Sequence, residues 1–177
     1  RVNTHLALKA TADFLRDKSA YLEREVALRT LEVQAIQDVT IMAMASLAET
    51  RDDETGNHIR RTQLYVKALA ERLRAHPRFE SVLNERMIEL LYKSVPLHDI
   101  GKIGIPDRIL LKPGPLEPEE FERMKEHAAL GRKAIEGAER RLGMRVRFLS
   151  VAKDIAYSHH ERWDGTGYPE NLAGDAI

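Results

Sequence analysis

The segment that decides the fold reads HDIGKIGIP and spans residues 98–106. It opens a passage rich in glycine and proline that runs to Pro118, a composition that predicts turns and loops. On both sides of this passage, Ala, Leu, Glu, Arg and Lys recur at helical spacing, and alternating runs of β-branched residues are nearly absent. The sequence therefore predicts an all-α protein in which an irregular segment joins helices.

The helices around this passage are predicted from their apolar stripes and from the residues that break them. The expected ranges are 58–75, 81–98, 118–142 and 145–159, with a short helical turn near 108–111. Pro77 ends the first of these helices, because proline does not continue a helix interior. Pro118, followed by two glutamates, suits the first turn of the third helix. Residues 161–177 are expected to form a loop.

The first fifty residues contain no Gly and no Pro, so one long helix is expected over 5–49. On a heptad frame, eight of the twelve a and d positions are apolar, and His5 and Arg29 are among the interruptions. Either this helix dimerises in parallel and couples an upstream domain to the rest, or it lies against its own domain. We favour the coiled coil because the stretch is longer than a local core requires. The expected division is a linker helix over 1–42 and a domain over 43–177.

The overall composition excludes several classes of protein. The chain has 28 Lys and Arg and 28 Asp and Glu, a balance that argues against binding of nucleic acid or an anionic membrane through a broad basic surface. Because it has no cysteine, disulfides, Fe–S clusters and thiol nucleophiles are excluded. Its longest apolar stretch is about ten residues, far short of a membrane span. These features predict a cytoplasmic protein, and the initial Arg1 suggests a piece of a longer chain.

The histidines carry the chemistry. Five of the seven lie beside helix ends or other candidate ligands: His58, His98, His127, His159 and His160. Asp99 follows His98 directly, and Glu54 lies four residues before His58. Any one of them alone would more often be a surface or hydrogen-bonded residue. Together, imidazoles and carboxylates form a ligand set for Zn, Fe, Mn, Co or Ni, and seven candidates exceed the needs of one ion. A bridging Asp99 would make the site dinuclear.

Together these motifs resemble the HD-GYP domain, a bacterial subset of the HD metal-dependent phosphohydrolases. The resemblance covers about residues 43–177. It is carried by His58, HDIGKIGIP at 98–106, KPGPL at 112–116, His127, and HHERWDGTGYP at 159–169. The preceding helix also resembles the linker that follows a receiver domain in two-component response regulators.

The resemblance implies an HD-type helical bundle around two or three divalent transition-metal ions. Fe or Mn is expected first, with Ni, Co and Zn as alternatives. It assigns the ligands as two triads: His58, His98 and Asp99, then His127, His159 and His160. Asp99 would bridge the two ions. Glu54 matches the acidic position that accompanies a third ion in some members.

The resemblance also implies hydrolysis of cyclic di-GMP by attack of a metal-bridging hydroxide on phosphorus, with either pGpG or GMP as the final product. Asp99 and Lys102 are the catalytic candidates. Lys102 matches the family lysine that contacts the scissile phosphate, where a fixed ammonium stabilises the charge that gathers on the phosphate oxygens.

The substrate-binding candidates besides Lys102 come from one loop: Gly165, Gly167, Tyr168 and Pro169. The glycines permit tight turns, and Tyr168 could stack on guanine or present a protein-contact surface. The family links this loop both to the substrate site and to docking of diguanylate cyclase (GGDEF) domains. A purely structural loop is the competing interpretation.

The sequence departs from the family pattern at its end. The family's last aspartate ligand lies beyond the loop, whereas this sequence stops at Ile177, and Asp175 is not expected to replace that ligand. We expect a truncated sequence. Two other functions stay open: a docking or cyclic di-GMP sensor module with weak catalysis, and an HD hydrolase acting on nucleoside triphosphates or alarmones.

Overall fold

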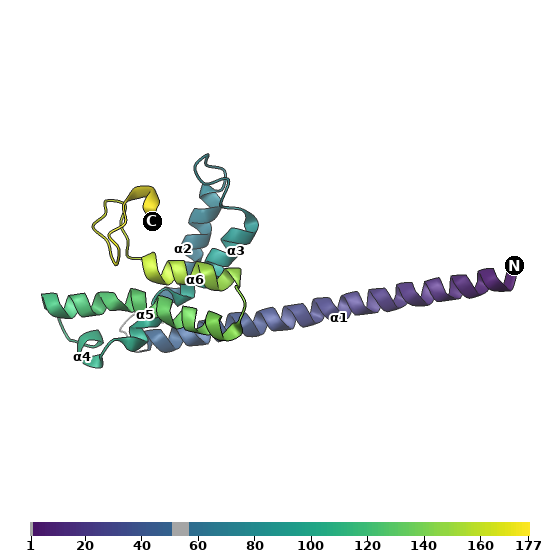
Figure 1. The fold of residues 1–177 in the computed structure, drawn as a ribbon, viewed down its shortest axis with the longest axis horizontal. Coiled ribbons are helices and arrows are strands. Elements are labelled where there is room, and N and C mark those ends of the chain that lie inside the picture. Colours follow the sequence, from purple (N-terminus) through teal and green to yellow (C-terminus); the bar gives the residue numbers. More distant parts are fainter. Residues whose placement is uncertain (1, 51–56) are drawn as a thin grey trace. The chain divides into compact units, whose positions relative to one another are not determined.

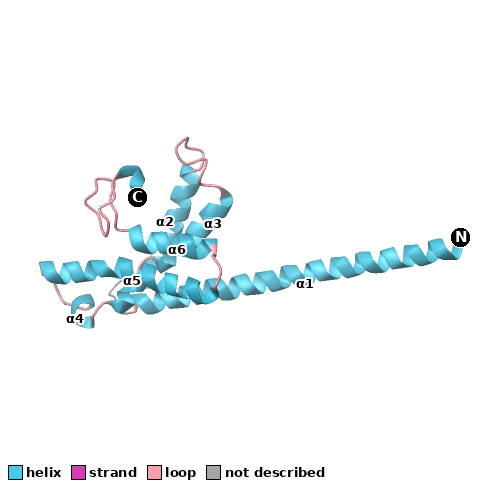
Figure 2. Ribbon diagram, viewed as in Figure 1, coloured by secondary structure: helices cyan, strands magenta, loops and turns pink. Residues whose placement is uncertain are grey.

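The computed structural model describes residues 2–50 and 57–177, which form helices and loops without an extended strand (Figure 2). The α-helices, in chain order, are α1 (Val2–Glu49), α2 (His58–Leu73), α3 (Glu85–Ser94), α4 (Asp107–Leu110), α5 (Pro118–Leu142) and α6 (Arg147–Ser158) (Figure 1). Three short 3₁₀ helices are η1 (Val95–Leu97), η2 (Ile100–Gly104) and η3 (Gly174–Ala176). The predicted all-α class and the long N-terminal helix are confirmed. None of the helices described here has a stretch long and apolar enough to traverse a bilayer.

The chain divides into two compact units, Arg1–Thr40 and Ile41–Ile177. The first unit is helical, and its polar side chains pair along the helix. Arg29 is the clearest case, since its guanidinium lies 3.2 Å from Glu25 Oε1 and 3.0 Å from Glu32 Oε2. Such exposed pairs each stabilise a helix by about 0.3–0.5 kcal/mol.

The second unit has a small apolar core in which α5 packs on α6 and η2, and α3 packs on α2 and α6. The core residues are Ile41, Leu97, Ile135, Ala152 and Ala156. Ala152 and Ala156 are fully buried one turn apart on α6. Because alanine is small, this face of α6 lets neighbouring elements approach closely.

The helix expected over 81–98 is wrong at both ends. It begins at Glu85 because the Asn84 side chain accepts a hydrogen bond from the Met87 N–H at 2.9 Å, an N-cap. It ends at Ser94 because Pro96 has no N–H with which to continue the helical ladder. The Tyr92 carbonyl, which would accept from residue 96 in a continuous helix, instead accepts a hydrogen bond from Nε2 of the buried Gln63 at 2.9 Å. His98 and Asp99 consequently lie outside α3, at the junction of η1 and η2.

Helix α5 has the predicted bounds, and its ends show why. Pro118 is the first residue, and Glu117 and Glu120 form a capping box in which Glu120 accepts from the Glu117 N–H at 2.9 Å. Gly143 ends the helix with φ of 72°, a conformation that glycine adopts without strain. The remaining predicted helices agree with the structure to within three residues at each end, and α2 stops at Leu73, before Pro77 is reached.

Candidate metal centre

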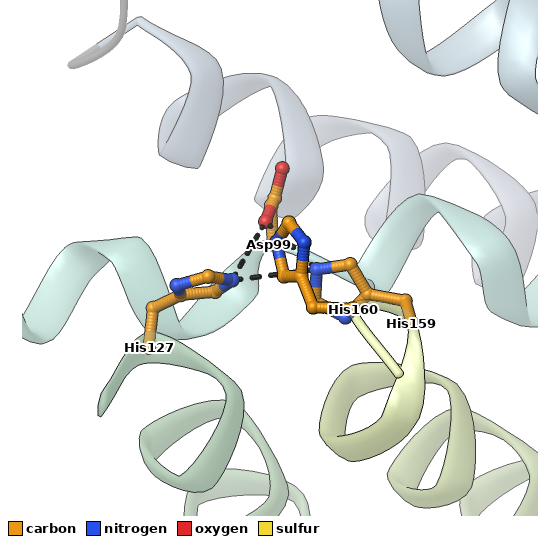
Figure 3. A group of neighbouring side chains, drawn as sticks. All are labelled: Asp99, His127, His159 and His160. Carbon is orange, nitrogen blue, oxygen red and sulfur yellow. Dashed lines mark hydrogen bonds and ion pairs between the residues drawn. The ribbon is translucent and has the colours of Figure 1, made fainter. Parts of the chain in front are cut away.

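Four side chains from three separate segments converge in the second unit: Asp99, His127, His159 and His160 (Figure 3). One ligand atom from each lies within 4.8 Å of the others. Asp99 Oδ1 is 3.3 Å from His127 Nε2 and 3.4 Å from His159 Nε2, and these two nitrogens are 3.3 Å apart. Asp99 precedes η2, His127 lies on α5, and the two remaining histidines follow α6.

The backbone fixes which nitrogen of each imidazole faces the cluster. In three rings, Nδ1 is hydrogen-bonded to a backbone carbonyl oxygen. The pairs are His98 with Val95 at 2.9 Å, His127 with Met124 at 2.7 Å, and His159 with Ile155 at 3.1 Å. Because a carbonyl can only accept, each Nδ1 must carry the hydrogen, and a neutral ring then has its lone pair on Nε2. This is the arrangement in which imidazoles bind metal ions, with the second nitrogen anchored.

The converging atoms of Asp99, His127 and His159 are therefore all acceptors. Asp99 Oδ1 is buried and has no hydrogen-bond partner among the residues that the structure describes. It faces the Nε2 lone pairs of His127 and His159 at little more than 3 Å. Such a group of lone pairs is unfavourable unless a cation lies between them. Imidazole nitrogen with carboxylate oxygen is a ligand set for divalent transition metals, so the residues fit a metal ion.

For Asp99, His127 and His160, the electrostatics of the cluster favour the protonation states that can bind a metal ion. Burial would raise the pKa of Asp99, but the hydrogen bond and charge of His98 and the charge of Lys102, both on the other oxygen, outweigh burial and hold that pKa far below its usual range. Burial lowers the pKa of His127. Burial, with the neighbouring His159 and His127, lowers the pKa of His160 to about 4. At neutral pH the carboxylate is therefore ionised, and His127 and His160 are neutral.

Two more predicted site residues, His98 and Lys102, lie at the second oxygen of Asp99. Oδ2 is 3.0 Å from His98 Nε2 and 2.9 Å from Lys102 Nζ. Burial lowers the pKa of His98, but the hydrogen bond and charge of Asp99 outweigh it, and the pKa is raised. The His58 ring lies 5.7 Å from the His98 ring, centroid to centroid. The structure thus gathers four of the five candidate histidines around Asp99 and places His58 beside His98, whereas Glu54 lies outside the described residues.

Gly101 explains how Asp99 comes so close to His127. A Cβ atom at Gly101 would lie 1.9 Å from the His127 carbonyl oxygen and 2.5 Å from the Gly131 nitrogen. Glycine at this position therefore lets η2 rest directly on the backbone of α5. The Asp99 carboxylate, two residues earlier, is held against the histidine of that helix.

Residues 161–172, here called the GYP loop, fold back onto the end of α6. A Cβ atom at Gly167 would lie 2.4 Å from Arg162 N and 2.5 Å from His160 O, so only glycine fits. Next to it, the Tyr168 N–H donates to the His160 carbonyl at 3.2 Å, and the two rings stack at 4.4 Å between centroids. Tyr168 therefore adjoins the cluster. Gly165, with φ of 75°, forms a turn of the same loop, and Pro169 follows Tyr168.

Glu161 is a functional residue that the sequence reasoning missed. Its carboxylate accepts the backbone N–H groups of Glu170 at 2.7 Å and Leu172 at 2.8 Å, and it thereby ties the far side of the GYP loop to the end of α6. The sequence signal was present, because an acidic residue directly follows the His159–His160 pair. Its partners are backbone groups, however, and backbone groups leave no trace in a sequence.

With this geometry established, comparison with known proteins identifies the family. The family model for the HD domain matches residues 55–176. The chain belongs to the HD domain family. The family and the cluster of histidines and aspartate together indicate that this HD domain binds divalent metal ions.

Three relatives show how this HD domain compares with longer proteins. A Vibrio cholerae serotype O1 protein named "Probable cyclic di-GMP phosphodiesterase" is 53% identical over the whole chain, which covers 40% of that relative. A second protein of that organism, named "Cyclic di-GMP phosphodiesterase", is 59% identical over 82% of the chain and 30% of the relative. The response regulator RpfG of Xanthomonas campestris pv. campestris, also named a cyclic di-GMP phosphodiesterase, is 33% identical over the whole chain and 43% of the relative. The chain thus spans less than half the length of each.

Proposed function

We propose that this HD domain is a metal-dependent phosphodiesterase that hydrolyses cyclic di-GMP to pGpG and onward to GMP. The observation that carries the proposal is the convergence of Asp99 with the Nε2 atoms of His127 and His159, without a donor among them. The names of the three relatives support the choice of substrate.

The ligands would divide between the two oxygens of Asp99, with Fe or Mn as the proposed ions. The two proposed ligand groups are His58 and His98 on one side, and His127, His159 and His160 on the other. Glu54 is the proposed ligand of a third ion. When bound, divalent ions supply Lewis-acid activation of water and of the phosphodiester group.

The chain's own residues hold and orient the substrate. The Lys102 ammonium lies beside Asp99 in a largely buried setting, 15% exposed, where a positive charge interacts strongly with phosphate oxygens. The Asp99 carboxylate fixes that ammonium at 2.9 Å. Lys102 is therefore the proposed residue for the non-bridging oxygens, and Tyr168 flanks the same site through its stack on His160.

The partners are proposed from the two exposed parts of the chain. Residues 1–42 would link an upstream receiver domain to the domain over 43–177, an arrangement supported by the RpfG relative, which is named a response regulator. The exposed apolar residues of α1 favour a second copy of the chain as its partner. The GYP loop exposes Trp163, and we propose this surface for docking a diguanylate cyclase (GGDEF) domain.

Turnover of cyclic di-GMP by the manganese-loaded full-length protein tests the proposal. Asp99→Ala should abolish turnover, whereas Asp154→Ala, which removes an exposed carboxylate from α6, should leave it unchanged. Undiminished turnover in Asp99→Ala, or none in the unaltered protein under anaerobic loading with either Mn or Fe, would contradict it.

The docking proposal predicts that Trp163→Ala loses binding of a GGDEF domain and keeps turnover.

A further inference from the structure

A phenylalanine and a lysine of α5 form an aromatic corner with Tyr168. Phe121 is 47% exposed, and its ring meets that of Tyr168 edge to face, with centroids 6.4 Å apart and planes at 83°. Lys125 lies one helical turn after Phe121, and its Nζ is 5.4 Å from the Phe121 centroid and 5.8 Å from the Tyr168 centroid. An ammonium group therefore stands beside two rings, one of them half open to solvent.

This corner adjoins the candidate metal centre. The Tyr168 ring stacks on His160 and lies 6.2 Å from the His127 ring. Helix α5 also carries His127 itself, two residues after Lys125. An aromatic surface of the kind that nucleobases stack on therefore borders the proposed phosphate site.

The chemistry of the corner suits one kind of base. Aromatic side chains stack on any nucleobase, because every base has a π face. An ammonium group can only donate hydrogen bonds. Guanine presents two acceptors, O6 and N7, on one edge, whereas adenine presents a donor amino group in place of O6. Lys125 pairs with Glu122 at 2.6 Å, but Glu122 is 70% exposed, and such a surface pair is weak enough to exchange for a ligand.

We propose that Phe121 and Lys125 form, with Tyr168, a binding site for a guanine base of the substrate. Phe121 supplies the stacking face, and Lys125 selects guanine over adenine. This proposal rests on the proposed phosphodiesterase function. It adds to the site two residues, Phe121 and Lys125, that the sequence motifs did not indicate.

The test compares Lys125→Met and Phe121→Leu in the full-length, manganese-loaded protein, with Lys133→Met as the matched control on the exposed part of α5. Two quantities are measured: KM for cyclic di-GMP, and the inhibition constant of cyclic di-AMP against that reaction. Lys125→Met should raise KM for cyclic di-GMP by about tenfold and raise the inhibition constant of cyclic di-AMP by much less, because adenine offers the ammonium group only N7. Phe121→Leu should raise both quantities, and Lys133→Met neither.

The outcomes separate this proposal from the function on which it rests. If Lys125→Met leaves KM unchanged, or shifts both quantities equally, the guanine selectivity is wrong while the phosphodiesterase stands. If the unaltered protein does not turn over cyclic di-GMP, the proposed function itself is wrong. Fluorescence of Trp163, the chain's single tryptophan, together with the melting temperature, shows whether each variant keeps the GYP loop folded.

Discussion

The Asp99 carboxylate has a different group of nitrogen atoms on each oxygen, with His127 and His159 on Oδ1 and His98 and Lys102 on Oδ2. Replacing it with asparagine keeps the shape but removes the charge and turns one ligand atom into an amide donor. We therefore expect Asp99→Asn to bring the metal content of the purified protein close to zero. His160→Asn, which removes one ligand from one side, should retain more metal. Elemental analysis per chain measures both, and equal metal content in the two variants would contradict a shared carboxylate.

The pH dependence of stability follows from the two imidazoles that are held neutral. Burial lowers the pKa of His127 and His160, the latter to about 4, whereas an unfolded histidine titrates near 6.5. Between pH 6.5 and 4 the unfolded chain therefore binds more protons, and the metal-free fold loses stability as pH falls. The raised pKa of His98 does not cancel this loss, since its contribution is complete below pH 6.5 and declines only above it.

We expect the free energy of unfolding of the metal-free protein to fall by on the order of 1 kcal/mol for His160 over this range, since the side chain is only partly buried and is screened by solvent. Urea denaturation at several pH values measures the slope. His160→Asn should be less sensitive to pH than the unaltered protein. Parallel curves for the two proteins would show that His160 is not held neutral by the fold.

Gly101 offers a test of the backbone contact beneath the site. A Cβ atom there would meet the His127 carbonyl oxygen at 1.9 Å, and backbone cannot move aside as a flexible side chain can. Gly101→Ala should destabilise the domain by about 3 kcal/mol or more. Gly137→Ala, on the same helix as His127 but with no atom within 4 Å of the added Cβ, should stabilise it by about 1 kcal/mol. Chemical denaturation of the pair distinguishes a steric effect from a general intolerance of alanine.

At the scale of elements, the sequence correctly predicted the helix ends that are set by residues at those ends. Pro118 and Gly143 mark the ends of α5, and both act through their own backbone geometry, so that helix was predicted to the residue. Helix α3 was predicted too long. The Asn84 cap competes with the apolar residues Val82 and Leu83, which precede it. At the other end, Pro96 has no N–H for the Tyr92 carbonyl, which accepts instead from Gln63 of another helix. That pairing depends on the tertiary fold, which a single sequence does not display.

The candidate site shows the same division. The residue types that bind metal could be predicted, because imidazole and carboxylate chemistry is carried by the side chain itself. The orientation of each ring could not, since it depends on the carbonyls of Val95, Met124 and Ile155. The position of Lys125 beside Tyr168 was likewise invisible, because the two residues are brought together by the return of the GYP loop.

The GYP loop itself depends on Glu161. Glu161→Ala removes two hydrogen bonds from backbone N–H groups to a carboxylate, so local opening of the loop should become easier by about 2 kcal/mol. Because Tyr168 and Trp163 belong to this loop, we expect increased quenching of tryptophan fluorescence by acrylamide and reduced turnover. Glu80→Ala, an exposed carboxylate outside the loop, is the control. Unchanged quenching in Glu161→Ala would mean that the glycine turns alone hold the loop.

At the scale of the whole molecule, the first unit is a helix whose apolar residues lie in water. Six of them fall on the a and d positions of one heptad frame, and all are about half or more exposed: Leu8, Leu15, Leu22, Val26, Val33 and Ile36. Arg29 interrupts the seam but is neutralised by Glu25 and Glu32 of its own helix. In a parallel, in-register pair, Lys18 at a g position would face Glu23 at the partner's following e position, an attractive contact.

Disulfide crosslinking tests this parallel pairing cleanly, because the chain contains no cysteine. Leu8→Cys and Ile36→Cys lie about 42 Å apart along one helix, so each can reach only its own counterpart in a parallel dimer. Each variant alone should form a covalent dimer under mild oxidation, and Asp17→Cys, at an outward-facing f position, should not. An antiparallel pair would instead crosslink the two variants only when they are mixed. If none of the three crosslinks, α1 has no second copy as its partner, and the exposed seam must serve another contact.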